Sequence, residues 1–247
     1  MDTLQEILGQ EIPPATSSII RPPSPRIVLP GERSEREASR DELATKIAKN
    51  MEAYFLNPWA MVEDGVIWTL DQTDMIYPIK RFPNHPWLEA VTNIWLQEPL
   101  FAMYKSRRMT ITWLMVFLHT WLAMFREGAS IYFVSDKEEK SDELVQRAAF
   151  ILDHIPDDMV LKPRYKYTYC YIDFPGLNTF IQGVPQGPDQ LRQFTATAIL
   201  CDEWAFWERA RETFGGAKPT IDGGGRFTGI SSPKDGFFKE LCFDLIR

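Results

Sequence analysis

Polar and charged side chains stand directly after apolar segments of this sequence, at the points where predicted strands end. The first group is the loop Lys105–Thr112, which reads KSRRMTIT and lies between a predicted strand and a long predicted helix. A phosphate-binding loop needs backbone amides at a helix N-terminus, a cation for the phosphates and a hydroxyl for magnesium. This loop has three cations and the hydroxyl of Thr112, but it lacks the glycines and the adjacent lysine of the standard motif. Taken alone, it is more typical of a basic turn.

The second group is the acidic pair Asp202 and Glu203, which ends the apolar run Ala198–Cys201. In nucleoside triphosphatases whose acidic residues follow a strand, the Asp at the strand end orders magnesium and the following Glu polarises the attacking water. Two acids can also simply end a buried strand and cap the next helix, and Asp202 fits both interpretations. The pair gains weight because it follows the basic loop in the chain order of these enzymes, about 90 residues later.

The third group is Gly229–Pro233, which reads GISSP at the end of another predicted strand. Small hydroxyl residues such as Ser231 and Ser232 can sense the terminal phosphate of a nucleotide at this place and relay its loss. An ordinary Ser-Pro turn explains the same residues when the other two groups are ignored. Only the three groups together therefore indicate nucleotide chemistry.

Alternating strands and helices are predicted to position these groups from about residue 98 onward. Strands separated by helices favour an α/β fold with a mostly parallel central sheet flanked by helices, in which ligands bind at the carboxyl ends of the strands. The predicted strands are 99–105, 130–136, 165–174, 179–184, 197–203 and 225–232. The predicted helices are 110–126, one that follows a capping box of Asp136 and Glu139, and one after residue 203 that breaks at Gly215 and Gly216.

The first 97 residues differ in composition from the rest of the chain. Residues 1–35 hold six of the 18 prolines and are predicted to form an extended arm. A helix is predicted over 36–56, because apolar residues recur at every fourth position from Leu43 to Phe55 and Pro58 follows. The aromatic segment that comes next predicts a lid or a packed preface to the sheet. The expected organisation is an arm at 1–35, a preface at 36–97 and a core at 98–247.

The composition excludes several classes of function. With 247 residues, 45% hydrophobic and 25% charged, the chain is long enough for one full domain and is not a wholly disordered protein. The formal net charge of −7 disfavours a protein that holds nucleic acid by its total charge, so any such contact must come from a local patch. Three widely spaced cysteines and no secretory signal argue for a reducing compartment. The apolar run 109–125 is short for a membrane span and is interpreted as a buried helix.

Taken together, the three groups and the residues around them resemble the ATPase domain of the large terminase subunit of tailed bacteriophages, the motor that packages double-stranded DNA into procapsids. The loop of that family often reads Lys-Ser-Arg-Gln-Met-Gly-Ile-Ser-Trp-Leu, and the stretch here reads KSRRMTITWL. The stretches TATAILCDEWAFW and GGGRFTGISSPKDG resemble its acidic strand and its coupling motif. The resemblance covers roughly residues 50–240, and the upstream stretch NPWAMVEDGVIWTLD resembles its adenine-side segment.

The resemblance implies a P-loop NTPase fold of the ASCE (RecA-like) class that hydrolyses ATP with Mg²⁺. It implies Glu203 as the catalytic base, Asp202 and Thr112 as magnesium ligands, and Arg192 as the arginine that reaches a neighbouring subunit's nucleotide, with Arg147 as second choice. The phosphate-binding residues it implies are Lys105, Ser106, Arg107, Arg108, Met109, Thr110, Ile111, Thr112, Ser231 and Ser232.

The same resemblance implies partners and a location. The partners are double-stranded DNA, the portal protein, the small terminase subunit and further copies of the chain in a homo-oligomeric ring, expected to be a pentamer. The location is the host cell cytoplasm and, transiently, the procapsid, but not the mature virion. The sequence ends at Arg247 without the nuclease domain of the family, so DNA cleavage by this chain is not expected.

One departure from the family pattern and two alternatives bear on these expectations. Thr110 stands where glycine is usual, and a β-branched residue resists positive φ, so either the loop keeps an ordinary conformation or nucleotide binding is weak. One alternative is a catalytically weak nucleotide-binding or assembly module. The other is a helicase-like DNA-dependent ATPase, which usually reads Asp-Glu-x-His or Asp-Glu-x-Asp rather than the Asp-Glu-Trp-Ala found here.

A local basic cluster is a weaker candidate for DNA contact. Lys162, Arg164 and Lys166 alternate with tyrosines, which predicts a strand with the cations on one face and the tyrosines on the other. A solvated strand face over a packed one explains the same alternation.

Overall fold

The structure is a computed structural model that describes residues 30–107, 109–155, 162–187, 190–191 and 195–243. By internal contacts the chain divides into two units, Met1–Ser39 and Arg40–Arg247. The described part of the first unit is the beginning of helix α1, which spans Pro30–Leu56. The second unit contains all three groups of residues that the sequence singles out, so the fold is described from that unit.

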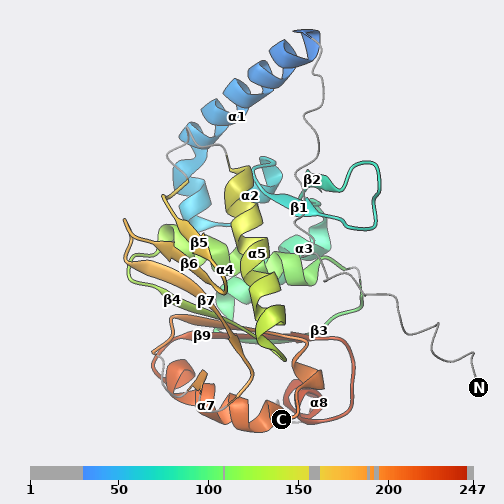
Figure 1. The fold of residues 1–247 in the computed structure, drawn as a ribbon, viewed down its shortest axis with the longest axis vertical. Coiled ribbons are helices and arrows are strands. Elements are labelled where there is room, and N and C mark those ends of the chain that lie inside the picture. Colours follow the sequence, from blue (N-terminus) through green and yellow to red (C-terminus); the bar gives the residue numbers. More distant parts are fainter. Residues whose placement is uncertain (1–29, 108, 156–161, 188–189, 192–194, 244–247) are drawn as a thin grey trace, which may run out of the picture. The chain divides into compact units, whose positions relative to one another are not determined.

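A seven-stranded sheet with the order β3-β9-β8-β4-β7-β6-β5 forms the centre of the second unit (Figure 1). The first five strands of this order are parallel, and β6 and β5 extend the sheet in antiparallel fashion. The strands are β3 Leu100–Tyr104, β4 Ser130–Ser135, β5 Lys166–Thr168, β6 Tyr171–Phe174, β7 Thr179–Pro185, β8 Ala198–Asp202 and β9 Arg226–Ser231. Nearly continuous burial along β4, β8 and β9 fits strands that are covered on both faces.

Helices cover both faces of the sheet and build two separate hydrophobic cores. Side chains alternate along β8, so that Ala198 and Leu200 enter the core formed with α4 and α5, whereas Ile199 and Cys201 enter the core formed with α7 and α8. Figure 1 shows α4 and α5 on one side of the sheet and α7 and α8 on the other.

The remaining elements are α2 Trp59–Glu63, β1 Trp68–Leu70, β2 Ile79–Arg81, α3 Pro86–Gln97, α4 Ile111–Phe125, α5 Glu138–His154, the 3₁₀ helix η1 Trp204–Phe206, α7 Ala210–Asp222 and α8 Phe237–Phe243.

The α/β prediction is confirmed, and most predicted elements lie where the sequence patterns put them. The strands predicted at 99–105, 130–136, 197–203 and 225–232 correspond to β3, β4, β8 and β9. The apolar helix is α4, and eleven of its fifteen residues are buried, as expected for a helix inside a core. In the described part of the chain no helix is both long enough and apolar enough to cross a membrane.

The beginning of α5 differs from the capping box that the sequence indicates. The helix begins at Glu138, and the residue before it, Lys137, makes no side-chain cap hydrogen bond. The carboxylate of Asp136 instead accepts a hydrogen bond from the side-chain amide of Gln186, at 2.6 Å. Asp136 therefore links the ends of β4 and β7 rather than capping the helix, and the capping-box prediction is wrong.

The strand predicted over 165–174 is divided into two strands. Cys170, at φ 55°, lies in the reversal between β5 and β6, and its amide donates to the carboxylate of Asp142 at 2.7 Å. The reversal pairs the two strands antiparallel and brings Asp173 opposite Lys166. One cation of the predicted basic cluster thus faces a carboxylate across the strand pair, which reduces the positive charge of that surface.

Two helices extend through residues that the sequence analysis places outside them. Helix α1 begins at Pro30, so residues 30–35 are helical rather than part of an extended arm, and proline is tolerated in the first turn of a helix. Helix α7 continues through Gly215 and Gly216, which were expected to break it. Each glycine costs about 1 kcal/mol in a helix. Packing of the buried face of α7, which includes Ala210, Thr213 and Ala217, against the second core opposes that cost.

A close approach between β9 and η1 fixes the residue that follows the acidic pair. Trp204 is fully buried, and its ring packs against Phe227 and Phe238 with centroids 5.1 and 5.3 Å apart. The indole lies directly over Gly229, where a Cβ would come within 2.7 Å of Cζ3 of Trp204 and still closer to Cε3. Glycine is therefore required at this position for steric reasons, independently of any catalytic role.

Replacing Gly229 by alanine is expected to lower the free energy of unfolding by about 1–3 kcal/mol, because the added methyl group overpacks the core at Trp204. Urea denaturation of the full chain measures the change. Gly215→Ala is the matched control, since nothing lies within 4 Å of its Cβ position in the interior of α7, and it is expected to gain about 0.5–1 kcal/mol. Equal effects of the two substitutions would contradict the close approach.

Candidate functional site

The order of the strands brings the three groups of polar residues to one edge of the sheet. Strand β9 lies between β3 and β8, and all three are parallel, so their carboxyl ends are neighbours. Lys105 follows β3, Ser231 ends β9 and is followed by Ser232, and Asp202 ends β8 and is followed by Glu203. The amide of Lys105 donates to the carbonyl of Ser231 at 2.8 Å, which continues the ladder one residue beyond β3.

Lys105 joins the basic loop to the acidic pair. Its ammonium lies 2.5 Å from Oε1 of Glu203 and 3.5 Å from Oδ1 of Asp202, and its side chain is only 9% exposed. A buried lysine is stable only when paired, and here it is paired with two carboxylates. The positions of these residues at predicted strand ends and the family resemblance both predict that they share one site, and the distances agree with that prediction.

Glu203 is held in a defined position by its backbone and by the residues after β9. It has a left-handed backbone conformation, with φ at 51°, which is uncommon for a residue other than glycine. Its Oε2 accepts the amide of Ser232 at 2.9 Å, and its Oε1 accepts the hydroxyl of Ser232 at 3.2 Å. Partial burial tends to raise the pKa of Glu203, but the hydrogen bonds from Lys105 and Ser232 outweigh it and lower the pKa below the usual value.

Asp202 has the opposite electrostatic balance. Burial raises the pKa of Asp202, and the charge of Glu203 adds to the increase, although Lys105 and Arg147 act to lower it. The hydroxyl of Thr112, in the first turn of α4, lies 3.4 Å from Oδ1 of Asp202. A buried carboxylate beside a hydroxyl is a suitable pair of oxygen ligands for a hard divalent cation.

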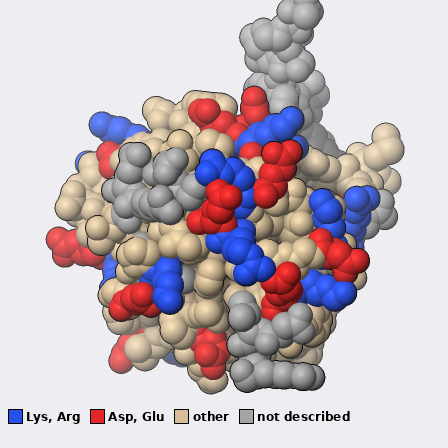
Figure 2. Space-filling model, turned by 90° about the horizontal axis from the view of Figure 1, so that it is seen from below, with Lys and Arg blue, Asp and Glu red and all other residues tan. Residues whose placement is uncertain are grey.

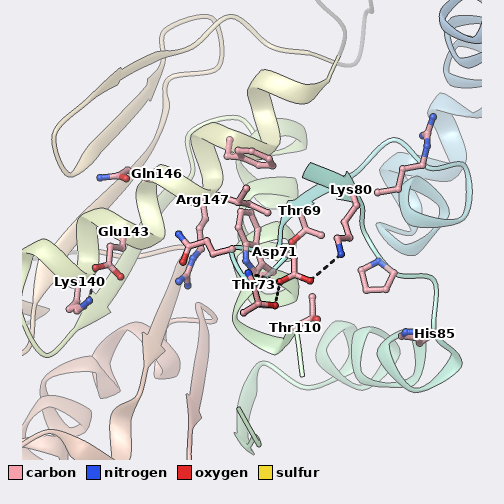
Figure 3. A pocket seen from close by; sticks show the side chains of 16 residues that line it. Thr69, Asp71, Thr73, Lys80, His85, Thr110, Lys140, Glu143, Gln146 and Arg147 are labelled. Atoms are coloured by element: carbon pink, nitrogen blue, oxygen red, sulfur yellow. Dashed lines mark hydrogen bonds and ion pairs between the residues drawn. The ribbon is translucent and has the colours of Figure 1, made fainter. Parts of the chain in front are cut away.

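Two adjoining cavities lie on either side of Thr110 and Trp113, and Lys105 and Thr112 of the cluster line the smaller one. The smaller has a volume of about 180 Å³ and is lined by the basic loop, with Lys105, Ser106, Arg107, Met109, Thr110, Ile111 and Thr112 all contributing, together with Trp113 and Arg147. The larger has a volume of about 900 Å³ and lies between α5 and the β1–β2 hairpin (Figure 3). Three residues line both cavities, namely Thr110, Trp113 and Arg147. The loop that the sequence singled out therefore forms the wall of a pocket.

Thr110 occupies the position where a glycine would relieve backbone strain. It stands directly before α4, with φ at 60° and ψ at 5°, in the left-handed region. That conformation costs a residue with a Cβ about 1–2 kcal/mol, and more when the Cβ is branched. Of the two outcomes that the sequence left open, an ordinary conformation of this loop is therefore wrong.

Three arginines of the expected site need separate description. Arg108 and Arg192 lie outside the described residues. Arg147 was considered only as an arginine acting on a neighbouring subunit, but it lines the cavities of its own chain. Within the described residues, no group of three or more His, Cys, Asp or Glu side chains could hold a metal ion by itself.

The β1–β2 hairpin contributes lining residues that were not assigned individually. The carboxylates of Asp71 and Asp74 each lie 3.0 Å from the ammonium of Lys80, and Asp71 also accepts the amide of Thr73 at 3.0 Å. These contacts hold the hairpin in shape beside the larger cavity, as the dashed lines in Figure 3 show for Asp71. The aromatic composition of 59–97 predicts a lid or a packed preface to the sheet. It does not indicate which residues of this segment line a cavity.

The structure is an α/β fold in which a mostly parallel sheet brings a basic loop, the N-terminus of α4 and an acidic strand end side by side. No protein-family model and no curated protein matches the sequence. Among the solved structures it resembles are large terminases of bacteriophages. The ATPase domain from Thermus phage P74-26 shares 16% identity with a TM-score of 0.50, over 65% of this chain and 69% of that chain.

A mutant of the same Thermus phage domain shares 15% identity with a TM-score of 0.53, over 65% of this chain and 70% of that chain. The large terminase of a thermophilic bacteriophage shares 16% identity with a TM-score of 0.50, over 62% of this chain and 40% of that chain. The chain thus has the fold of terminase ATPase domains. At these identities the similarity concerns the fold, and the chemistry has to be argued from the site.

Replacing Thr110 by glycine is expected to raise the free energy of unfolding by about 0.5–1 kcal/mol. Relief of the left-handed backbone gives about 1–2 kcal/mol, and the greater freedom of glycine in the unfolded chain removes part of it. Urea denaturation measures the difference. Thr45→Gly, at an exposed position inside α1, is the matched control and is expected to lose a few tenths of a kcal/mol. A loss of stability in Thr110→Gly would contradict the strain.

Proposed function

We propose that this chain is the ATPase motor domain of a viral terminase large subunit, which hydrolyses ATP to drive double-stranded DNA into a procapsid. The observation that carries the proposal is the cluster of Lys105, Asp202, Glu203 and Ser232 at the ends of three adjacent parallel strands, beside the loop that precedes α4. A cation, a metal-binding acid, a base and a helix N-terminus are the parts that phosphoryl transfer requires.

The residues present fit ATP and Mg²⁺. The ammonium of Lys105 is a cation beside the smaller cavity, held by the carboxylates of Asp202 and Glu203. Thr112 and Asp202 offer oxygen ligands next to it. When bound, Mg²⁺ would supply positive charge to the phosphate oxygens. Thr112 and Asp202 would hold the ion, and Lys105 with the loop amides would bind the β- and γ-phosphates.

Glu203 is the proposed general base. Its lowered pKa keeps the carboxylate ionised at neutral pH, so that it can accept a proton from an attacking water at Oε1 or Oε2. Both oxygens now contact Lys105 or Ser232, so the base becomes free only when Lys105 turns to the phosphates. Ser231 and Ser232, which contact Glu203, are proposed to relay the loss of the γ-phosphate.

The two cavities are proposed to divide the nucleotide between them. The smaller one, lined by the basic loop, would take the phosphates. The larger one has a volume of about 900 Å³, which suits a ribose and base, because ligand pockets typically measure about 300–1,000 Å³. Residues of the β1–β2 hairpin line it, which agrees with the proposed adenine-side role of the segment 36–97.

The proposed partners follow from the terminase fold. They are double-stranded DNA, a portal protein, a small terminase subunit and other copies of the chain in a ring, in the host cytoplasm and transiently on the procapsid. Arg192 is the proposed arginine that acts on a neighbouring subunit. On the face shown in Figure 2, cations and carboxylates of the described residues are intermixed, which agrees with local rather than global attraction to DNA.

Replacing Glu203 by glutamine is expected to lower the ATPase kcat by about 10²–10⁴-fold, because the amide cannot accept the proton of the attacking water. Steady-state turnover is measured at high protein concentration or on assembled rings, since a partner subunit contributes to the proposed site. Glu208→Gln, five residues along and exposed, is the control and should retain full activity. Undiminished turnover in Glu203→Gln would remove Glu203 as the base.

One observation favours the alternative of a nucleotide-binding or assembly module with little activity. The strained Thr110 stands at the position where glycine lets the backbone approach a phosphate. Calorimetry separates the two functions. The motor proposal expects ATP both to bind and to be hydrolysed once DNA and portal are present, whereas binding without any turnover under those conditions supports the module.

Asp202→Asn is expected to abolish the dependence of ATP affinity on Mg²⁺ while leaving metal-free nucleotide binding within about threefold, because the loop cations remain. Isothermal titration calorimetry with AMP-PNP, in Mg²⁺ and in EDTA, measures both affinities. Asp173→Asn, on β6 and away from the cavities, serves as the control. A variant that keeps the wild-type gain in affinity from Mg²⁺ would exclude Asp202 as a ligand.

A further inference from the structure

Arg147 stands at the junction of the two cavities. It lies on α5, its side chain is partly buried, and it lines both the cavity of the basic loop and the cavity beside the β1–β2 hairpin. Figure 3 shows it extending from α5 into the larger cavity, whose other wall carries Asp71 and Thr73. Any molecule that extends from one cavity into the other must pass this side chain.

The guanidinium of Arg147 is held by an aromatic ring. Its central carbon lies 5.7 Å from the centroid of Trp113, and the ring of Phe150 packs edge-on against Trp113 with centroids 5.5 Å apart. A cation–π contact with an indole leaves the hydrogen-bond donors of a guanidinium unused. The N–H groups of Arg147 are therefore available to a ligand.

No carboxylate within the described residues forms an ion pair with Arg147. The nearest acid along the helix, Glu143, pairs instead with Lys140 at 2.5 Å, and Asp71 across the cavity pairs with Lys80 at 3.0 Å. The positive charge nevertheless reaches the site, because Arg147 helps to lower the pKa of Asp202. A partly buried arginine that has no ion-pair partner among the described residues and lies beside the basic loop is suited to bind an anion.

We propose that Arg147 binds the α-phosphate of the nucleotide within its own chain. The inference rests on the proposed function, which puts the β- and γ-phosphates in the smaller cavity and the ribose and base in the larger one. The α-phosphate is the group that joins these two parts, and Arg147 lies where the two cavities meet. Arg147 is therefore a substrate-binding residue in cis and does not act on a neighbouring subunit.

Contact with the α-phosphate predicts effects of Arg147 on nucleotide affinity, KM and kcat that differ from those of the other cations of the site. ATP and ADP share the α-phosphate, so Arg147 stabilises both complexes equally and stays in contact during hydrolysis. It therefore affects KM and nucleotide affinity but not kcat. A residue directed at the γ-phosphate, as proposed for Arg192, affects ATP more than ADP and lowers kcat.

Arg147→Gln in the full chain is expected to weaken ATP and ADP by the same factor, about 10–100-fold, with kcat within about threefold of wild type. Arg147→Lys keeps the charge but loses the planar stack on Trp113, so it should recover part of the affinity. Arg126→Gln, an exposed arginine at the end of α4 opposite the basic loop, is the matched control and should bind both nucleotides normally. Calorimetry and steady-state kinetics measure the values, and urea denaturation confirms that each variant folds.

The possible results are distinguishable. Unchanged affinities in Arg147→Gln, with normal binding by the wild type, overturn this inference and leave the proposed function intact. A loss confined to ATP, or a large fall in kcat, overturns the α-phosphate assignment in favour of the γ-phosphate. Failure of the wild-type chain to bind either nucleotide overturns the proposed function and the inference together.

Discussion

The site depends on the ion pair of Lys105 with Asp202 and Glu203. Two adjacent carboxylates at the end of a buried strand repel each other and lose hydration, so they are stable only beside a cation. The cation comes from a strand that is not the neighbour of β8, since β9 lies between β3 and β8. A lysine side chain is long enough to cross this strand. The sheet order, the length of Lys105 and the small hydroxyl residues at the end of β9 are therefore parts of one arrangement.

Strain in the described backbone is concentrated beside this ion pair. Four residues other than glycine have positive φ, and two of them, Thr110 and Glu203, flank the site. Such conformations persist only where the surrounding structure determines them, and here it does. Trp204 is locked over Gly229, and the amide of Ala205 donates to the hydroxyl of Ser231 at 3.0 Å, so the chain can leave β8 only through a tight turn at Glu203.

The strands and their ends can be predicted well from the sequence. Strands that are buried on both faces are continuous apolar runs, and a polar residue marks where each run ends. The sequence also predicts that Lys105, Asp202 and Ser232 meet, since parallel strands bring their carboxyl ends together. It fails where a tertiary partner decides the outcome. Asp136 bonds to Gln186 instead of capping α5, the amide of Cys170 is held by Asp142, and packing carries α7 through its glycines. The apolar face of α5 can be read from the sequence, but the place of Arg147 between the two cavities depends on where the β1–β2 hairpin packs, and no local pattern encodes that.

The charges of the site bear on the proposal that a neighbouring subunit supplies a cation. Asp202 and Glu203 carry two negative charges, and Lys105 with Arg147 balances them, so the described cluster is close to neutral before nucleotide binds. A magnesium–ATP complex brings about two further negative charges, and more charge develops on the equatorial oxygens during phosphoryl transfer. The ammonium of Lys105 cannot contact the γ-phosphate and remain paired with Glu203. If it turned to the phosphates, Glu203 would lose this ion pair, and Mg²⁺ would have to compensate the charge of the two carboxylates. Arg107, which lines the smaller cavity, is a further cation of the same chain, and the proposed arginine of a neighbouring subunit would add to it as charge develops on the transferring phosphoryl group.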